Sequence, residues 1–191
     1  MRNQLRPALV SVGLFTLLTG ILFPAVITGI ASVAFPHQAH GSLIKQNGQT
    51  IGSELIGQAF SKPEYFQPRP SGAGSDGYDG ASSSGTNLGP TNAKLTKSLM
   101  ERVAAYRKTN ALEANAPVPA DAVTASASGL DPHISPENAR LQVARVAKAR
   151  SKPIEEVQRL VDSHTAGRSL GVLGEPGVNV LTLNIALDSI K

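Results

Sequence analysis

One uninterrupted apolar run dominates the hydropathy pattern of this chain. Residues 7–35 contain no charged side chain. A helix needs about 20 apolar residues to cross a hydrocarbon core of about 30 Å, so this run is long enough to span a membrane with some tilt. Gly13 and Gly20 predict a face for close packing against partner helices, and Pro24 predicts a kink near Gly20.

A cleaved signal peptide is the alternative interpretation of the same run. Arg2 and Arg6 form a short basic start, and small residues near Ala34 resemble a cleavage site. However, the apolar core of a signal peptide is usually about 7–15 residues long, which favours a permanent anchor. The positive-inside rule then predicts a single-pass protein with residues 1–6 in the cytoplasm, the span at 7–35 and residues 36–191 outside.

Periodic patterns beyond the span predict one α+β domain. Leu95, Leu99, Val103 and Tyr106 share one side of a helix that is expected to follow an N-cap at Asn92 or Thr91 and to run to about Asn110, as part of the core. A second helix is expected at about 136–150, with Ser135 as its N-cap; its buried residues would be Ala139, Val143, Val146 and Ala147. A third is expected at about 153–164, capped by Ser151 and with Ile154 on its apolar face. Alternation predicts strands near 43–44, weakly at 122–128, and most clearly at 178–187, while 51–60 fits a short helix or strand.

A long loop, residues 61–92, is rich in Gly, Ser and Pro and cannot form a long regular element. Such a composition is typical of a flexible linker. Yet Phe60, Tyr65, Phe66 and Tyr78 lie in it or at its edge. Aromatic side chains on a proline-stiffened loop are typical anchors of protein interfaces, which favours an ordered, partner-contacting loop.

Composition and charge narrow the possible functions. The chain has 191 residues, no Cys, and 18 basic against 14 acidic side chains, with two of the basic ones ahead of the span. The remainder is close to neutral, so nucleic acid is not an expected partner, and basic residues on the 136–164 helix pair do not change this. Without Cys, stability must come from packing or partners.

Candidate chemistry is sparse. The sequence has no Walker A motif, no aspartyl-phosphate motif of P-type ATPases, and no HExxH, GxSxG or GxGxxG motif. Ser126, Ser128, Asp131 and His133 contain the residue types of a hydrolytic triad, but Asp131 before Pro132 is more simply a turn. His37 and His40 lack further metal ligands nearby. We therefore expect no catalytic residue, no metal and no firmly bound cofactor, as in an accessory subunit.

Long blocks of the sequence resemble the KdpC family, the C subunits of the high-affinity potassium-transporting Kdp ATPase of prokaryotes. They include FSKPEYFQPRPS at 60–71, SGTNLGPTN at 84–92, VPADAVTASASGLDPHISPENA at 118–139 and LGEPGVNVLTLNIALD at 173–188. The resemblance implies a bacterial inner-membrane complex with three partners: a channel-like potassium-selective subunit, a P-type ATPase and a small single-span subunit. It also implies a role in stabilising the complex and in raising the ATP affinity of the ATPase as a catalytic chaperone.

The family resemblance links a glutamine after the SGLDP block with nucleotide, and Gln142 is the candidate here. The predicted topology conflicts with direct contact, since it places Gln142 outside while a P-type pump binds ATP in the cytoplasm. An effect on ATP would then be transmitted by conformation. The alternative function is a free single-pass binding or adhesion domain of the envelope.

Overall fold

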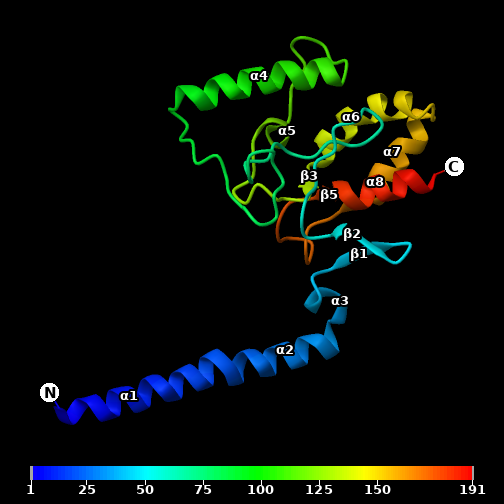
Figure 1. Cartoon of the computed structure of the whole chain (residues 1–191). Coiled ribbons are helices and arrows are strands. Elements are labelled where there is room, and N and C mark those ends of the chain that lie inside the picture. The colour runs from blue at the N-terminus through cyan, green and yellow to red at the C-terminus, as the bar shows by residue number, and fades with distance from the viewer. Residues whose placement is uncertain (1, 191) are drawn as a thin grey trace. The chain divides into compact units, whose positions relative to one another are not determined.

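The computed structural model describes residues 2–190, with Arg2 by its backbone only (Figure 1). The described residues form two compact units, one up to residue 51 and the other from residue 52 onward. Together they contain both helices and sheets and one long apolar N-terminal helix, which confirms the mixed α and β class. The side of the membrane on which the domain lies stays a prediction.

The first unit is built on the apolar helix. Helix α1 (Arg2–Leu17), a π-helical turn η1 (Leu18–Leu22) and α2 (Phe23–Ala34) follow one another without a break. The apolar stretch Asn3–Ala34 has 32 residues, long enough to cross a membrane, and none of its most apolar window is buried by the chain itself. The short helix α3 (Pro36–Ala39) and a two-stranded sheet, β1 (Leu43–Gln46) with β2 (Gln49–Ser53), complete the unit.

The π-helical turn lies near Gly20, where Pro24 predicts a kink. The π-helical turn contains Gly20 and ends just before Phe23 and Pro24. Proline lacks the N–H that an α-helix needs, and a π turn is one way for a helix to absorb that loss. The Phe23 N–H bonds to the carbonyl of Leu18, five residues earlier, as this geometry requires.

The core of the second unit lies where three helices meet a small sheet. Helices α6 (Pro136–Ala149), α7 (Ile154–Ser163) and α8 (Val180–Ser189) form a cluster, coloured yellow to red in Figure 1. The antiparallel sheet has the order β3 (His133–Ile134), β5 (Gly177–Asn179) and β4 (Thr165–Ala166). The predicted stripe of α6 is confirmed, since Ala139, Val143, Val146 and Ala147 are all buried there.

Helix α6 also begins as predicted. Ser135 accepts a hydrogen bond from the Asn138 N–H, and Pro136 occupies the first turn. Helix α7 differs in detail: Pro153 holds its N-cap position, Ser151 lies outside with a positive φ of 53°, and Ile154 is exposed. Val157 and Val161 form the buried face of α7.

The strand predicted at 178–187 is wrong for most of its length. Only Gly177–Asn179 is strand, and Val180–Ser189 is helix α8. Asn179 caps this helix by accepting a bond from the Thr182 N–H. The alternating aliphatic residues mimic a strand, but the buried set, Val180, Leu181, Leu183, Asn184 and Leu187, has helical spacing.

The remaining elements are small or peripheral. The weak strand predicted at 122–128 is wrong, because Ala120–Val123 forms a single helical turn, α5, and no strand follows in that fully described stretch. Of residues 51–60 only the first three belong to a strand, β2. Helix α4 (Ala93–Thr109) starts at Asn92 as predicted. Its apolar face is only half-buried, and none of its side chains enters the core, which corrects that expectation.

Candidate functional site

The loop predicted at 61–92 lacks regular structure, but its first part is held against the helices. We call residues 60–71 the strap. The strap contains three prolines and therefore cannot pair as an ordinary strand. Its backbone groups still need partners where they are buried. In this domain the partners are side chains of α6 and α8.

Two carboxamides bind two successive residues of the strap. Asn184 Oδ1 accepts from the Phe66 N–H at 2.9 Å, and its Nδ2 donates to the Phe66 carbonyl at 3.0 Å. Gln142 repeats the arrangement with Gln67, at 2.7 Å from the N–H and 3.1 Å to the carbonyl. A carboxamide offers a donor and an acceptor side by side, so it can replace a neighbouring strand.

Two arginines hold the preceding carbonyls of the strap. Arg145 Nη1 donates to the carbonyls of Pro63 and Tyr65, at 2.5 and 2.9 Å. Arg150 Nε donates to the Glu64 carbonyl at 2.8 Å. Burial lowers the pKa of Arg145, but an arginine stays charged at any physiological pH. Charge-assisted bonds are stronger than neutral ones, so the strap is firmly held.

The aromatic residues of the loop differ in how far they are available to partners. Phe66 is fully buried in the core and anchors the strap from inside, and its predicted contact with a partner stays a prediction. Phe60 and Tyr65 are half-buried, with ring centroids 5.5 Å apart. Arg150 lies over the Tyr65 ring at 4.8 Å, and the Tyr65 hydroxyl donates to Asp188 at 3.1 Å.

Tyr78 closes the loop back onto the strap. Its hydroxyl donates to the Arg69 carbonyl at 2.6 Å, and its N–H donates to Ser71 Oγ at 2.8 Å. The residue has a φ of 58°, a left-handed conformation that costs free energy in a bulky residue. Burial, followed by the nearby Asp131 charge, raises the pKa of the Tyr78 hydroxyl. Partner contacts by Phe60, Tyr65 and Tyr78 remain predictions.

Gln142 is committed to contacts within the domain. Its side chain is only 1% exposed. Besides its two bonds to Gln67, its Nε2 donates to Asn138 Oδ1 at 2.9 Å and its Oε1 accepts from Arg145 at 2.6 Å. A primary carboxamide has two donors and two acceptor lone pairs, so all four are used. Nucleotide contact through this amide requires breaking bonds that hold the strap.

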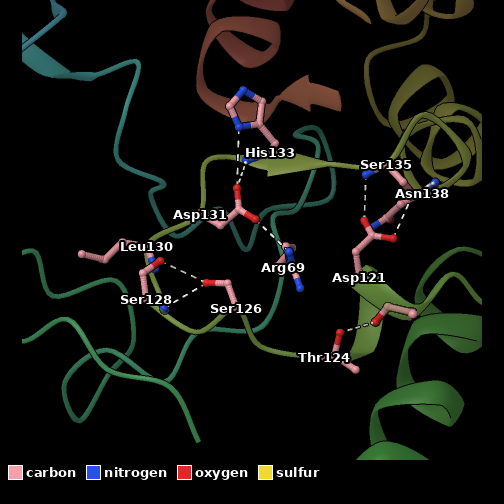
Figure 2. A network of polar contacts seen from close by, with 12 residues as sticks. Arg69, Asp121, Thr124, Ser126, Ser128, Leu130, Asp131, His133, Ser135 and Asn138 are labelled. Carbon is pink, nitrogen blue, oxygen red and sulfur yellow. Dashed lines mark hydrogen bonds and ion pairs between the residues drawn. The ribbon is translucent and has the colours of Figure 1, made fainter. Parts of the chain in front are cut away.

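Gln142 is joined through Asn138 to a polar network at the start of α6. Figure 2 shows Asp121, Ser135 and Asn138 of this network. Asp121 accepts bonds from the Ser135 N–H, the Ser135 hydroxyl and Asn138 Nδ2, each at 2.8 Å. Tyr106 of α4 donates to Asn138 Oδ1 at 2.8 Å. This network attaches α4 and α5 to α6.

A second part of the network is centred on Asp131. Arg69 Nη1 lies 2.7 Å from Asp131 Oδ2, and the His133 N–H donates to Oδ1 at 2.9 Å. Burial raises the pKa of Asp131, but the hydrogen bonds from His133 and the charge of Arg69 outweigh it and lower the pKa to about 2. The carboxylate is therefore ionised and holds a turn, as the Asp-Pro sequence predicts.

The serines near Asp131 bond to the backbone. Ser126 Oγ accepts from the Gly129 N–H, and Ser128 Oγ accepts from the Leu130 N–H. In Figure 2 both serines lie apart from the His133 ring. The arrangement is a structured turn, which agrees with the simpler interpretation of these residues.

A cavity of about 410 Å³ lies beside the strap. Its lining includes Phe60, Arg69, Tyr78, Tyr106 and Gln142. The Nε of Arg69 is buried and has no hydrogen-bond partner among the described residues. The strap, the cavity and the polar network thus form one continuous site on the domain.

The membrane-helix candidates are placed on the apolar helix. A Cβ added to Gly13 or Gly20 would meet no atom of this chain within 4 Å. Seven residues separate them, which puts both on nearly the same side of a helix. Thr19 donates its hydroxyl to the Phe15 carbonyl at 2.6 Å. The roles of Gly13, Gly20 and Pro24 in packing against partners remain predictions.

The sequence missed the side chains that hold the strap. Asn184 was expected in a strand, where its position gave no reason to single it out. Arg145 and Arg150 were counted only among the basic residues of a helix pair. One signal could have pointed to this site, namely a polar residue on the apolar face of a helix. Three carboxamides are of this kind, and all are buried: Asn138, Gln142 and Asn184. Such residues need hydrogen-bond partners, which points to irregular backbone beside them.

The fold and site define a protein with one apolar helix of membrane-spanning length and an α+β domain in which side chains of the core hold the backbone of a proline-rich loop. Comparison with known proteins is more specific. The family model "KdpC: K+-transporting ATPase, c chain" matches residues 5–189. The chain belongs to the KdpC family, whose members are subunits of the K+-transporting ATPase.

Individual relatives match over the full chain. A potassium-transporting ATPase KdpC subunit of Mycobacterium bovis is 56% identical over 190 residues, covering 100% of both chains. That of Beijerinckia indica is 56% identical over 99% of this chain and 95% of its own. That of Herpetosiphon aurantiacus is 54% identical over 100% and 98%. These matches confirm the family resemblance, and they do not support the alternative of an unrelated envelope domain.

Proposed function

We propose that this chain is a non-catalytic accessory subunit that stabilises an ATP-driven, high-affinity potassium import complex. The observation that carries the proposal is the match to KdpC subunits over the entire chain at 54–56% identity. Its partners are then a channel-like potassium-selective subunit, a P-type ATPase subunit and a small single-span subunit. The chain crosses the inner membrane once, with its N-terminus in the cytoplasm and its domain outside.

The surface of the strap is the proposed contact with the potassium-selective subunit. The domain caps the outer mouth of that subunit and presents Phe60 and Tyr65. Both rings are half-buried, so part of each is available, whereas Phe66 supports them from the core. Because the strap backbone is clamped by α6 and α8, these rings are held in position before binding. A rigid binding surface loses little conformational entropy on association.

An effect on ATP affinity, which the family resemblance implies, acts in this proposal through assembly. In the proposed topology Gln142 and the ATP site lie on opposite sides of the bilayer. The four hydrogen bonds of the buried Gln142 amide support the same view, because they leave it no free donor or acceptor. Gln142 is then a positioning residue for the strap.

The test is co-purification of the partner subunits with Tyr65→Ala, compared with Met100→Ala as an exposed control on α4. We expect Tyr65→Ala to reduce recovery of the complex and potassium uptake while the chain alone still unfolds cooperatively. Unchanged assembly and transport would contradict the role of the strap. For nucleotide, the purified chain should not bind a fluorescent ATP analogue; binding that Gln142→Ala abolishes would refute the indirect mechanism.

A further inference from the structure

The turn between β4 and β5 exposes three neighbouring aliphatic side chains. Leu170 is 89% exposed, Val172 72% and Leu173 58%. We call residues 169–173 the apolar turn. Single exposed apolar residues are common on protein surfaces, but three large ones within four positions form a concentrated patch. Neither the strap nor the polar network involves this turn.

The apolar turn has a defined backbone structure. Ser169 and Leu173 exchange two hydrogen bonds of 2.9 Å each. The N–H groups of Gly171 and Val172 bond to carbonyls at its start, at 3.0 and 3.2 Å. Leu170 adopts a φ of 54°, which an aliphatic residue rarely does and which directs the chain back on itself. Most of the turn's backbone donors are therefore satisfied without water.

The charges beside the apolar turn neutralise each other. Arg168 Nη2 and Glu175 Oε2 lie 2.6 Å apart across its base. Between these two residues the turn carries no charge and no aromatic ring. The residues that carry most of the binding energy at protein interfaces are enriched in Trp, Tyr and Arg; residues 169–173 contain none of these, and the neighbouring Arg168 is paired with Glu175. A neutral aliphatic tip with an internally bonded backbone is instead suited to the boundary of a lipid bilayer, where backbone groups must be satisfied internally.

The membrane anchor keeps the domain near such a boundary. Residues 35–51 join the apolar helix to the domain through α3 and the paired strands β1 and β2, so they span well under the length of about 60 Å that 17 fully extended residues would reach. A domain of this size has a radius of gyration of about 14 Å, so its surface stays within a few tens of ångströms of the end of this short connector. Tethering raises the effective concentration of the interface, which lets a small apolar patch bind.

We propose that the apolar turn inserts Leu170, Val172 and Leu173 into the interfacial region of the bilayer that the chain's own helix spans. The turn thereby acts as a second, reversible contact with lipid and limits how the domain rotates on its tether. The attraction is apolar, because Arg168 and Glu175, the charged residues that flank the turn in the sequence, form a neutral pair. It is therefore independent of anionic headgroups.

The absence of Cys from the sequence makes a direct test possible. A nitroxide label on Val172→Cys, in the full chain reconstituted into phosphatidylcholine nanodiscs, reports collisions with dissolved oxygen and with a water-soluble nickel chelate. The same label on Met100→Cys of α4, 68% exposed, is the matched control. We expect the label at 172 to lose collisions with nickel and gain collisions with oxygen relative to the label at 100. Equal accessibility at the two positions would overturn the proposal.

Further measurements distinguish apolar insertion into lipid from binding to anionic headgroups or to a protein surface. Adding phosphatidylglycerol should leave the accessibility at 172 unchanged; a requirement for anionic lipid would overturn apolar insertion. Adding Leu170→Asn, which suits a positive φ, should return the label to water. If the label at 172 is protected only when the partner subunits are present, the occupant is a protein surface and the lipid proposal fails.

Discussion

The side chain of Asn184 on α8 pairs with both backbone polar groups of Phe66, which lies 118 residues earlier in the chain. The two bonds measure 2.9 and 3.0 Å, and both residues are almost completely buried. Because these two bonds hold the backbone of Phe66, they also fix the position of its side chain in the hydrophobic core.

Removing this carboxamide should destabilise the domain more than removing an exposed one. Asn184→Ala leaves the N–H and the carbonyl of Phe66 buried without partners, which costs about 2–4 kcal/mol in the free energy of unfolding. Gln158→Ala, whose carboxamide bonds to Asp162 on the surface, is the control and should cost under about 0.5 kcal/mol. Denaturant titration of the full chain in detergent measures both; equal losses would contradict the role of Asn184.

Substitutions at Phe66 and Tyr65 should lower the folding stability by different amounts. Phe66→Ala empties a fully buried site and should cost about 3–5 kcal/mol of folding stability. Tyr65→Phe keeps the ring over Arg150 and removes only the bond to Asp188, so the stability loss should stay near 1 kcal/mol, at about the worth of one hydrogen bond. Thermal melts of the two variants test this difference. A small loss for Phe66→Ala would show that the strap is not part of the core.

Stability should decrease at low pH partly through Asp131. Its pKa in the folded domain, about 2, lies below its ordinary value of 3.8. The carboxylate therefore contributes stability above pH 3.8, and this contribution is lost as the pH falls toward 2. Since Asp131 is 29% exposed on its side chain, the effect is on the order of 1–2 kcal/mol.

Asp131→Asn isolates that contribution from the titration of other acids. The variant should be less stable than the wild type at neutral pH, and the two should converge as the pH approaches 2. Urea midpoints across this range are the measurement. A constant difference between the two proteins at every pH would assign the effect to packing instead of charge.

The glycines of the apolar helix should matter only for assembly. A Cβ added at Gly20 meets no atom within 4 Å beyond its own stretch of helix, so Gly20→Leu should leave the isolated protein intact. Close helix packing in membranes depends on small residues, so the same change should lower co-purification of the partner subunits. Gly29→Leu, equally open and on a different side of the helix, is the control. Equal recovery of the complex with both variants would contradict the predicted packing face.

Local signals account for what the sequence predicted correctly. The charge-free run, the Asn92 cap and the Ser135-Pro136 start each act within a few residues of their own position. The fold class and the two long helices α4 and α6 follow from them. The sequence does not reveal the helix at 180–189, because its alternating aliphatic residues satisfy a strand pattern and its cap, Asn179, lies inside the stretch predicted as a strand.

The sequence by itself determined the apolar helix, the capped helices α4 and α6, and the family to which the chain belongs. Only the tertiary structure decided where the strap lies. Its backbone is held by Gln142, Arg145, Arg150 and Asn184, which are 75 to 118 residues away along the chain from their strap partners. Contacts at such separation leave no periodic pattern. They arise because a proline-rich segment cannot satisfy its own backbone and must find donors and acceptors elsewhere in the fold.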